Sequence, residues 1–299
     1  MKYCVLFISI ILAASCASAE PRKKTTFHVT DAEIGVALTN AQVTVYNKGW
    51  DTKKVDENGI CVFEGFSSPS KSMGWAGHTE LDGYYKNSSK VRYTEVNRIL
   101  NRWEPWNSIV EVKLRKIKKP LPMVAKRIES LDILEWNKPV GFDLEKADWI
   151  APHGKGHRSD FYVNMYRRFE HSGDFDAVAT ITFPNDGDGI QLYRVPAAYT
   201  SSSYKFPYEA PTDAYQSKFV LECHATLRET KASFDRKTDR YIFRVRTEKD
   251  KEGNIISACY GRIGGIEIGW GDVLDFSYYF NPVPNECSLE YNGENLLKK

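Results

Sequence analysis

Two histidines and an aspartate lie close together in a glycine-containing stretch of the chain. His153 and His157 flank Gly154-Lys155-Gly156, and Asp160 follows. Two imidazoles and one carboxylate suit a divalent transition metal, and the glycines would let the backbone turn both rings inward. The alternative is an exposed loop, since the two glycines disfavour the helix that would place both histidines on one face. His153, His157 and Asp160 are therefore a candidate metal site, and no cofactor is indicated elsewhere.

Closely spaced oxygen ligands occur in the segment Asn185-Asp186-Gly187-Asp188-Gly189. The segment is similar to part of a calcium loop, but a full EF-hand loop has a Glu at its twelfth position, and counting from Asp186 that position is Ala197. Asn, Asp and Gly are also the usual residues of β-turns. A turn between two strands is the favoured interpretation.

Aromatic side chains are frequent in the first part of the chain, where they could form a stacking platform for sugar rings. Indole and phenol faces suit the apolar faces of sugars, and Arg102 and Glu104 could hydrogen-bond hydroxyl groups. The same rings could instead fill a sandwich core or a domain interface. The candidate binding residues are Trp75, Tyr84, Tyr85, Arg102, Trp103 and Trp106.

The sequence carries no recognised catalytic motif. It contains no Gly-x-Ser-x-Gly elbow, no HExxH, no P-loop and no Rossmann fingerprint. Asp143, Glu145 and Asp148 could pair as in glycoside hydrolysis, although sequence does not fix the distance between carboxylates. We assign no catalytic residue.

The elements that must position these residues are predicted to be strands. Tyr and Phe are abundant, which favours half-buried sheet surfaces. Residues 109–117 alternate with a period of two, and residues 241–247 and 255–263 form a hairpin around the turn at 250–254. No segment has sustained helical periodicity. The predicted fold class is mainly β.

The opening strands carry a recognisable pattern. Val29-Thr30-Asp31 precedes Leu38-Thr39-Asn40-Ala41-Gln42-Val43-Thr44-Val45, and Asn58-Gly59 supplies a tight turn before residues 60–63. This pattern resembles the transthyretin-like, carboxypeptidase-regulatory-like β-sandwich family. The resemblance implies a seven-stranded sandwich that serves as a structural or binding module and contributes no catalytic residues.

Prolines mark the predicted boundary between two domains. Pro120 and Pro122 end the strand at 109–117, because proline lacks a ladder donor. We therefore expect a transthyretin-like β-sandwich at residues 20–120, followed by a second antiparallel β-rich domain of unknown function at residues 121–299.

The chain as a whole has a second resemblance, to a group of uncharacterised exported bacterial proteins. The segments that carry it are residues 102–107, 120–127, 141–149, 152–156 and 281–285. This second resemblance implies no known activity.

Residues 1–19 have the three parts of a signal peptide: a basic start, a short apolar run and the Ala17-Ser18-Ala19 end. Cleavage there would release a chain that begins at Glu20. The alternative is a lipobox at Ala13-Ala14-Ser15-Cys16 with a lipid on Cys16. Either reading predicts an exported protein that is periplasmic or extracellular, or held on a membrane by its lipid.

Charge and cysteine content narrow the choice of partners. Lys and Arg total 41 and Asp and Glu 39, so the charges nearly balance and no nucleic-acid partner is expected. A membrane is expected as a partner only if Cys16 carries a lipid. Cys61, Cys223, Cys259 and Cys287 permit two disulfides or buried thiols. The predicted function is a non-catalytic binding or structural protein of the bacterial envelope that recognises a glycan or an envelope protein. The alternative is a secreted hydrolase acting on polysaccharide or peptide through the second domain.

Overall fold

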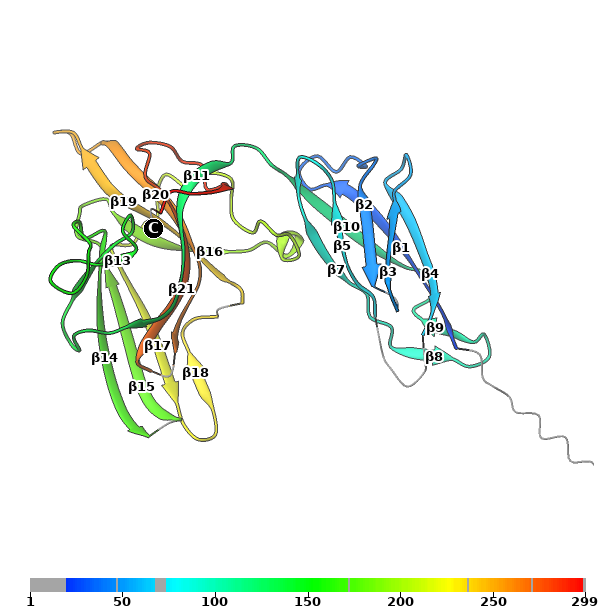
Figure 1. Ribbon diagram of the computed structural model, residues 1–299, viewed down its shortest axis with the longest axis horizontal. Helices are drawn as coiled ribbons and strands as arrows, with labels where there is room; N and C mark the ends of the chain where they lie inside the picture. The colour runs from blue at the N-terminus through cyan, green and yellow to red at the C-terminus, as the bar shows by residue number, and fades with distance from the viewer. Residues whose placement is uncertain are drawn as a thin grey trace, which may run out of the picture. The chain divides into compact units, whose positions relative to one another are not determined.

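The computed structural model describes residues 20–46, 48–67, 74–171, 173–235, 237–269 and 271–297. The signal peptide and Cys16, predicted at residues 1–19, lie outside the described residues. Within the described part, strands dominate and the one helical element is the short 3-10 turn η1 (Ala197–Tyr199), as Figure 1 shows. The mainly β prediction is confirmed. In this part of the chain, no helix has the length and apolar character needed to cross a membrane.

The chain forms two compact units. Unit 1 comprises residues 1–82 and 86–114, and unit 2 comprises residues 83–85 and 115–299. The short segment Gly83–Tyr85 belongs to unit 2 because β6 (Tyr84–Tyr85) pairs with Arg115 and Lys116 there. Each unit has its own buried core.

Unit 1 contains two sheets. One has β1 between the parallel strand β10 and the antiparallel strand β4, and β1 also touches the β8–β9 hairpin. The other has the order β3-β2-β5-β7. Bounds are β1 (Arg22–Asp31), β2 (Gln42–Tyr46), β3 (Trp50–Lys54), β4 (Ile60–Phe66), β5 (Ala76–Glu80), β7 (Asn87–Lys90), β8 (Glu95–Asn97), β9 (Arg102–Glu104) and β10 (Ser108–Lys116).

The core of unit 1 is built from aromatic rings. Period-two alternation in β1 turns Phe27 inward, where its ring meets the edge of Phe63 with centroids 5.6 Å apart. Phe63 then contacts Trp75 at 6.0 Å, and Trp75 contacts Tyr93 at 6.2 Å. Such edge-to-face pairs are the preferred geometry for buried rings.

Unit 2 also contains two sheets, most of whose strands are labelled in Figure 1. Their strand orders are β16-β19-β20-β21-β11-β22 and β13-β12-β14-β15-β17-β18. The first sheet comprises β11 (Leu121–Asp132), β16 (Gly189–Arg194), β19 (Asp239–Lys249), β20 (Ile255–Gly269), β21 (Val273–Asn281) and β22 (Tyr291–Asn295). The second comprises β12 (Val140–Asp143), β13 (Asp148–Trp149), β14 (Phe161–His171), β15 (Asp174–Thr182), β17 (Lys218–Ala225) and β18 (Thr230–Ala232).

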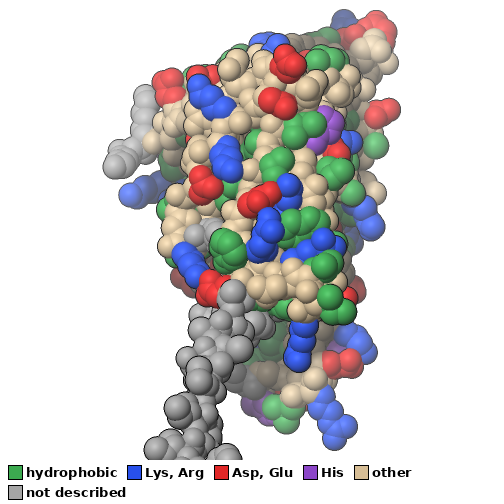
Figure 2. All heavy atoms as spheres, turned by 90° about the vertical axis from the view of Figure 1, so that its right-hand side faces the viewer, with side chains coloured by type: hydrophobic (Ala, Val, Ile, Leu, Met, Phe, Trp, Pro, Cys, Tyr) green, Lys and Arg blue, Asp and Glu red, His purple; other side chains and the backbone are tan. Residues whose placement is uncertain are grey.

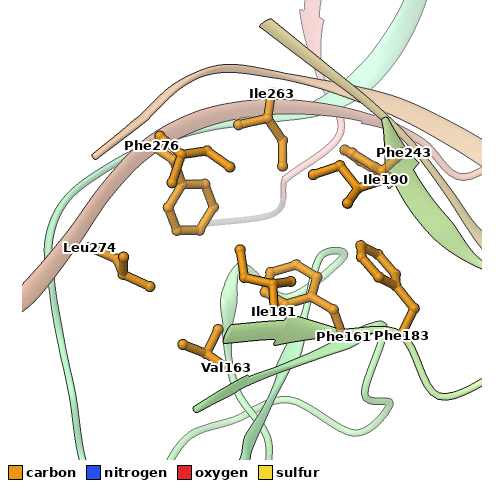
Figure 3. A pocket seen from close by; sticks show the side chains of 10 residues that line it. Phe161, Val163, Ile181, Phe183, Ile190, Phe243, Ile263, Leu274 and Phe276 are labelled. Carbon is orange, nitrogen blue, oxygen red and sulfur yellow. The ribbon is translucent and has the colours of Figure 1, made fainter. Parts of the chain in front are cut away.

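The inward faces of these two sheets form one apolar core. In β21, Leu274, Phe276, Tyr278 and Phe280 are buried, and the intervening residues point to the other face. A cavity lies within this core, lined wholly by apolar side chains (Figure 3). Its volume of ≈ 10 Å³ is about that of one water-sized sphere, so it is a packing gap rather than a ligand pocket.

The outward face of the first sheet is partly covered by the segment 202–210. Tyr204, Phe206 and Ala210 of this segment pack on Ile242 and Leu289. The buried Arg115 holds the segment in place, because its Nη1 donates to the carbonyl oxygens of Tyr204 at 3.0 Å and Phe206 at 2.6 Å. Its guanidinium also lies over three tyrosine rings, 4.4–4.9 Å from their centroids.

The four cysteines of the described chain are free thiols. Cys61, Cys223 and Cys259 are buried, and Cys287 is half-buried. Burial raises the pKa of Cys61 to about 11, which makes its thiol unreactive near neutral pH. Of the two readings of the cysteines, the structure therefore has buried thiols rather than disulfides.

Candidate functional site

The structure corrects the predicted aromatic platform in unit 1. Trp75 and Trp103 are only 2% and 3% exposed. Trp103 donates its indole N–H to the carbonyl oxygen of Ser67 at 3.2 Å. Neither ring can stack on a sugar, because both are already enclosed by the core of unit 1.

The remaining predicted platform residues also have partners. Arg102 lies over the Trp106 ring, 5.2 Å from its centroid, and pairs with Glu104. Tyr84 and Tyr85 belong to unit 2, where the Tyr85 ring stacks on Tyr204 at 4.6 Å. Sequence reasoning missed several exposed rings, among them Tyr46 and Trp50, which meet across the β2–β3 pair.

Two of the three candidate metal residues have other side-chain partners. His153 pairs through Nε2 with Glu135 at 3.0 Å, and Asp160 is bound by the guanidinium of Arg246. Within the described ranges, no three or more His, Cys, Asp or Glu side chains form a group that could hold a metal ion. His153, His157 and Asp160 are thus not brought together. The nearby glycines serve packing, since a Cβ at Gly154 would lie 2.4 Å from the oxygen of Trp149.

The Asn185–Gly189 segment forms the turn between β15 and β16, as predicted. Asp188 is buried and accepts hydrogen bonds from the backbone N–H groups of Arg246 and Thr247. Burial raises the pKa of Asp188, although these hydrogen bonds oppose the shift. The segment therefore braces β19.

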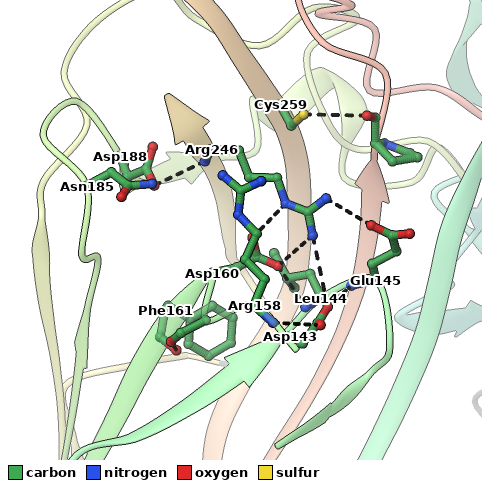
Figure 4. Close-up of polar contacts among 12 residues, drawn as sticks. Asp143, Leu144, Glu145, Arg158, Asp160, Phe161, Asn185, Asp188, Arg246 and Cys259 are labelled. Atoms are coloured by element: carbon green, nitrogen blue, oxygen red, sulfur yellow. Dashed lines mark hydrogen bonds and ion pairs between the residues drawn. The ribbon is translucent and has the colours of Figure 1, made fainter. Parts of the chain in front are cut away.

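Arg246 joins several carboxylates of unit 2 into one network (Figure 4). Its guanidinium contacts Asp160 at 2.8 and 3.1 Å and Glu145 at 2.9 Å. Burial lowers the pKa of Arg246, but the hydrogen bonds and charge of Asp160 outweigh that effect and raise it. A bidentate arginine–carboxylate pair of this kind fixes both partners.

The carboxylates considered for hydrolysis belong to this same framework. Burial raises the pKa of Asp143, but backbone N–H groups from His157, Lys146, Arg158 and Glu145 more than offset it and keep the pKa below its usual range. Asp143 therefore holds no proton to donate as a general acid at neutral pH. Asp148 accepts the backbone N–H groups of Trp149 and Lys155. These side chains brace the loops beside β12.

A hollow of ≈ 460 Å³ on the outward face of the first sheet of unit 2 has a different character. We call it the basic hollow. Its lining residues are Arg127, Ser203, Lys205, Phe206, Arg240, Arg262, Gly264, Gly265, Ser277 and Tyr279. Four of the ten are cationic and none is acidic. The volume lies within the range of about 300–1,000 Å³ that is typical of ligand sites.

Strand register explains why the surface is depressed there. Across four neighbouring strands, Arg240 pairs with Gly264, Gly264 with Ser277, and Ser277 with Arg127. Residues that pair directly across a sheet point to the same face. Of the two central positions in this row, Gly264 has no side chain and Ser277 has a small one. They form the floor of the hollow, with Arg240 and Arg127 on either side.

The segment 202–210 adds a wall and a further cation. Because Arg115 fixes the carbonyl groups of Tyr204 and Phe206, the residue between them, Lys205, is held at the hollow. Burial lowers the pKa of Lys205, and the charge of Arg240 lowers it further. Lys205 is therefore a partly desolvated cation beside a second cation.

Arg262 lies at the centre of the sheet and contacts aromatic rings. Its guanidinium is 3.8 Å from the centroid of Tyr279 and 4.7 Å from that of Phe206, and its Nε donates to the carbonyl oxygen of Leu289. Burial lowers the pKa of Arg262. Rings and a carbonyl orient this cation but do not neutralise it.

The two outer arginines have acidic neighbours outside the hollow. Arg127 pairs with Glu129 at 2.8 Å, and both side chains are 68% exposed, so the pair contributes little. Burial lowers the pKa of Arg240, and Asp239 and Asp235 partly offset the shift. The lining itself still presents positive charge and N–H donors, which is the chemistry of an anion site.

This local field contrasts with the face of the molecule that is drawn in Figure 2. In the view of Figure 2, cationic, anionic and hydrophobic side chains are interspersed without a large field of one sign. That mixture agrees with a net charge of +2 over the whole sequence. The basic hollow is thus a concentration of charge that overall composition does not reveal.

Comparisons with known proteins add little. No family model matches the chain, and no curated protein matches it. A solved protein of unknown function from Bacteroides fragilis NCTC 9343, described as membrane-associated, is 13% identical with a TM-score of 0.23, covering 88% of this chain and 99% of that one. BcpA, the major pilin subunit of Bacillus cereus, is 10% identical with a TM-score of 0.23, covering 92% and 97%. At these values neither likeness carries an argument.

Proposed function

We propose that this chain is a non-catalytic binding protein of the bacterial envelope, and that unit 2 binds an anionic ligand in the basic hollow. The observation that carries the proposal is the lining, in which Arg127, Lys205, Arg240 and Arg262 converge without a carboxylate. Burial holds Lys205 and Arg262 partly out of water, so an anion that enters the hollow gains more from these two cations than it would on an ordinary surface.

The ligand class follows from the neutral groups in the lining. Ser203 and Ser277 offer hydroxyl groups, and Phe206 and Tyr279 offer ring surface. Hydroxyl-bearing ligands with a carboxylate or sulfate use all three kinds of contact. We therefore propose an acidic saccharide unit, which keeps the predicted glycan partner but moves it from the aromatic residues of unit 1 to unit 2.

The remaining parts of the proposal concern organisation and location. Unit 1 is proposed to be a transthyretin-like sandwich module within residues 20–120, supported by its two sheets and by the turn at Asn58–Gly59. Residues 121–299 would form the binding domain. The leader at residues 1–19 supports export to the envelope, with or without a lipid on Cys16.

The test measures binding by titration calorimetry on the chain from Glu20 onward. Inorganic sulfate, inorganic phosphate, a uronic-acid disaccharide and its neutral counterpart are the four probes. We expect the uronic-acid disaccharide to bind most tightly and its neutral counterpart to bind at least about tenfold more weakly, because it lacks the charge-assisted hydrogen bonds.

Two variants locate the site. The double variant Lys205→Met, Arg240→Gln should weaken binding of the acidic disaccharide by about tenfold or more. The matched control is Arg228→Gln, an exposed arginine of unit 2 outside the hollow. Equal affinity of the double variant and the control would overturn the site. Turnover of the acidic disaccharide would overturn the non-catalytic reading in favour of a hydrolase.

A further inference from the structure

The hairpin of β8 and β9 in unit 1 exposes two large apolar side chains at its tip. Ile99 is 95% exposed and Leu100 is 54% exposed. The tip is held in a defined shape, because the side-chain oxygen of Asn97 accepts the backbone N–H groups of both residues at 3.1 Å. A hairpin that is fixed by its own hydrogen bonds keeps these side chains in solvent, where they gain nothing for the fold.

Cationic and aromatic side chains adjoin the tip. Arg98 is exposed within the turn itself. Arg22 and Arg102 both lie over the Trp106 ring, 5.4 and 5.2 Å from its centroid. Arg102 also pairs with Glu104, and Arg22 lies 3.7 Å from Glu64. Arg98, by contrast, has no acidic partner among the described residues. Exposed aliphatic residues beside arginine and tryptophan are typical of segments that enter a membrane interface.

The hairpin also adjoins the start of the described chain. The backbone N–H of Arg22 donates to the carbonyl oxygen of Asn101 at 3.0 Å. In the parallel pairing of β1 with β9, Arg22 lies opposite Arg102. Cys16, the candidate lipidation residue, precedes Arg22 by 22 − 16 = 6 residues. Six residues reach at most about 20 Å, so a lipid on Cys16 would keep this tip close to the bilayer surface.

We propose that the β8–β9 hairpin tip is a docking site for an anionic lipid surface. Ile99 and Leu100 enter the boundary between headgroups and acyl chains, and Arg98 contacts lipid phosphate. This inference is independent of the proposed anion site, which lies in unit 2.

A turn elsewhere in unit 1 provides a matched control. Ile34 and Val36 are 73% and 58% exposed, and Asp31 accepts the backbone N–H groups of Glu33 and Ile34. This turn also exposes two large apolar side chains and has the same kind of side-chain hydrogen bonds to its backbone. It differs in charge, because its flanking residues Asp31 and Glu33 are acidic.

The experiment is co-sedimentation with vesicles of phosphatidylcholine alone or mixed with phosphatidylglycerol. The chain begins at Glu20, because the apolar run in residues 1–19 would bind lipid by itself. We expect binding to the mixed vesicles. Ile99→Ser with Leu100→Ser should lower the bound fraction by about tenfold, since two apolar side chains no longer leave water. Ile34→Ser with Val36→Ser should leave it unchanged.

Two further variants separate the contributions. Arg98→Gln should reduce binding to the mixed vesicles and leave the weaker binding to pure phosphatidylcholine unaltered. In the background of Lys205→Met with Arg240→Gln, the loss caused by Ile99→Ser with Leu100→Ser should be as large as in the wild type, because the hairpin contact does not involve the basic hollow. The proposal is overturned if the wild-type chain binds neither vesicle, if the hairpin variant binds as well as the wild type with an unchanged circular dichroism spectrum, or if only the variant in the basic hollow loses binding.

Discussion

Lys23 in unit 1 and Arg246 in unit 2 are both cations held out of water, and their pKa values move in opposite directions. Lys23 is 3% exposed and lies over the Trp75 ring at 4.9 Å. Burial, and to a smaller extent the charge of Lys48, lower its pKa to about 8. The pKa of Arg246 is raised because Asp160 binds its guanidinium through two hydrogen bonds. A ring face does not replace a carboxylate as the partner of a buried cation.

Three cations of the basic hollow resemble Lys23, because burial lowers their pKa values as well. Lys205, Arg240 and Arg262 all have pKa values lowered chiefly by burial. The difference is access, since the hollow is open to solvent and Lys23 is enclosed. An anion from solution can therefore supply to the hollow what Asp160 supplies to Arg246.

The largest expected effect comes from breaking the paired cation. Arg246→Met would leave Asp160, which has a side chain 0% exposed, without its partner. We expect a loss of about 3–5 kcal/mol in the free energy of unfolding, measured by urea denaturation. The control is Arg168→Met, whose carboxylate partners Glu170, Asp174 and Asp176 are all partly exposed and which should lose less than about 1 kcal/mol. Equal losses would contradict the comparison.

The next effect has the opposite sign. Lys23→Met should increase the free energy of unfolding at pH 7, by up to about 3 kcal/mol, because the folded state no longer holds a desolvated ammonium group. The unfolded lysine has a pKa of 10.5 and the folded one about 8, so between these values the unfolded state binds more protons and wild-type stability gains with rising pH.

The gain from Lys23→Met should therefore be complete below pH 8 and shrink steadily as the pH rises toward 10.5. The difference between variant and wild type is the quantity to follow, because it cancels the titration of the buried cysteines. Lys90→Met, at an exposed position of β7, should show no such pH dependence. A gain that stays constant from pH 7 to pH 9.5 would exclude desolvation of Lys23 as its cause.

The basic hollow should show a smaller, ligand-dependent effect. Without sulfate, Lys205→Met should change stability by no more than about 0.5 kcal/mol. With sulfate at about ten times its dissociation constant, the wild type should gain about 1.4 kcal/mol and the variant much less. Thermal unfolding at matched ionic strength, with chloride in place of sulfate, isolates the specific effect. An equal gain in both proteins would remove Lys205 from the site.

Alternation along the strands could be read from the sequence, and with it the mainly β fold. The same pattern predicts that Arg262, Gly264, Ser277 and Tyr279 face one way. What it does not supply is register. The basic hollow exists because Gly264 is opposite both Arg240 and Ser277, and that pairing depends on bulges and loop lengths that no local pattern encodes.

The predicted sites were chosen by residue type, and type does not determine exposure. Trp103 and Trp106 are three residues apart, yet Trp103 is buried and Trp106 lies beneath two arginines. His153 and His157 share a short loop, but its glycines pack against Trp149 instead of turning the rings toward each other. Tertiary packing decides these outcomes, and it is also what brings Lys205 to Arg240 from a distant segment.

The smallest expected effect tests whether burial rather than residue type governs unit 1. Trp50 is 68% exposed and its ring contacts Tyr46 edge-on at 5.3 Å. Trp50→Ala should therefore lower the free energy of unfolding by less than about 1 kcal/mol, the value of one aromatic pair. Trp103→Ala, which removes a buried indole of the same unit, should lose about 3–5 kcal/mol. Urea denaturation of the two variants gives the ratio directly. Similar losses would mean that Trp50 is enclosed by something beyond the described residues, and that the exposed ring pair on β2 and β3 is part of an interface.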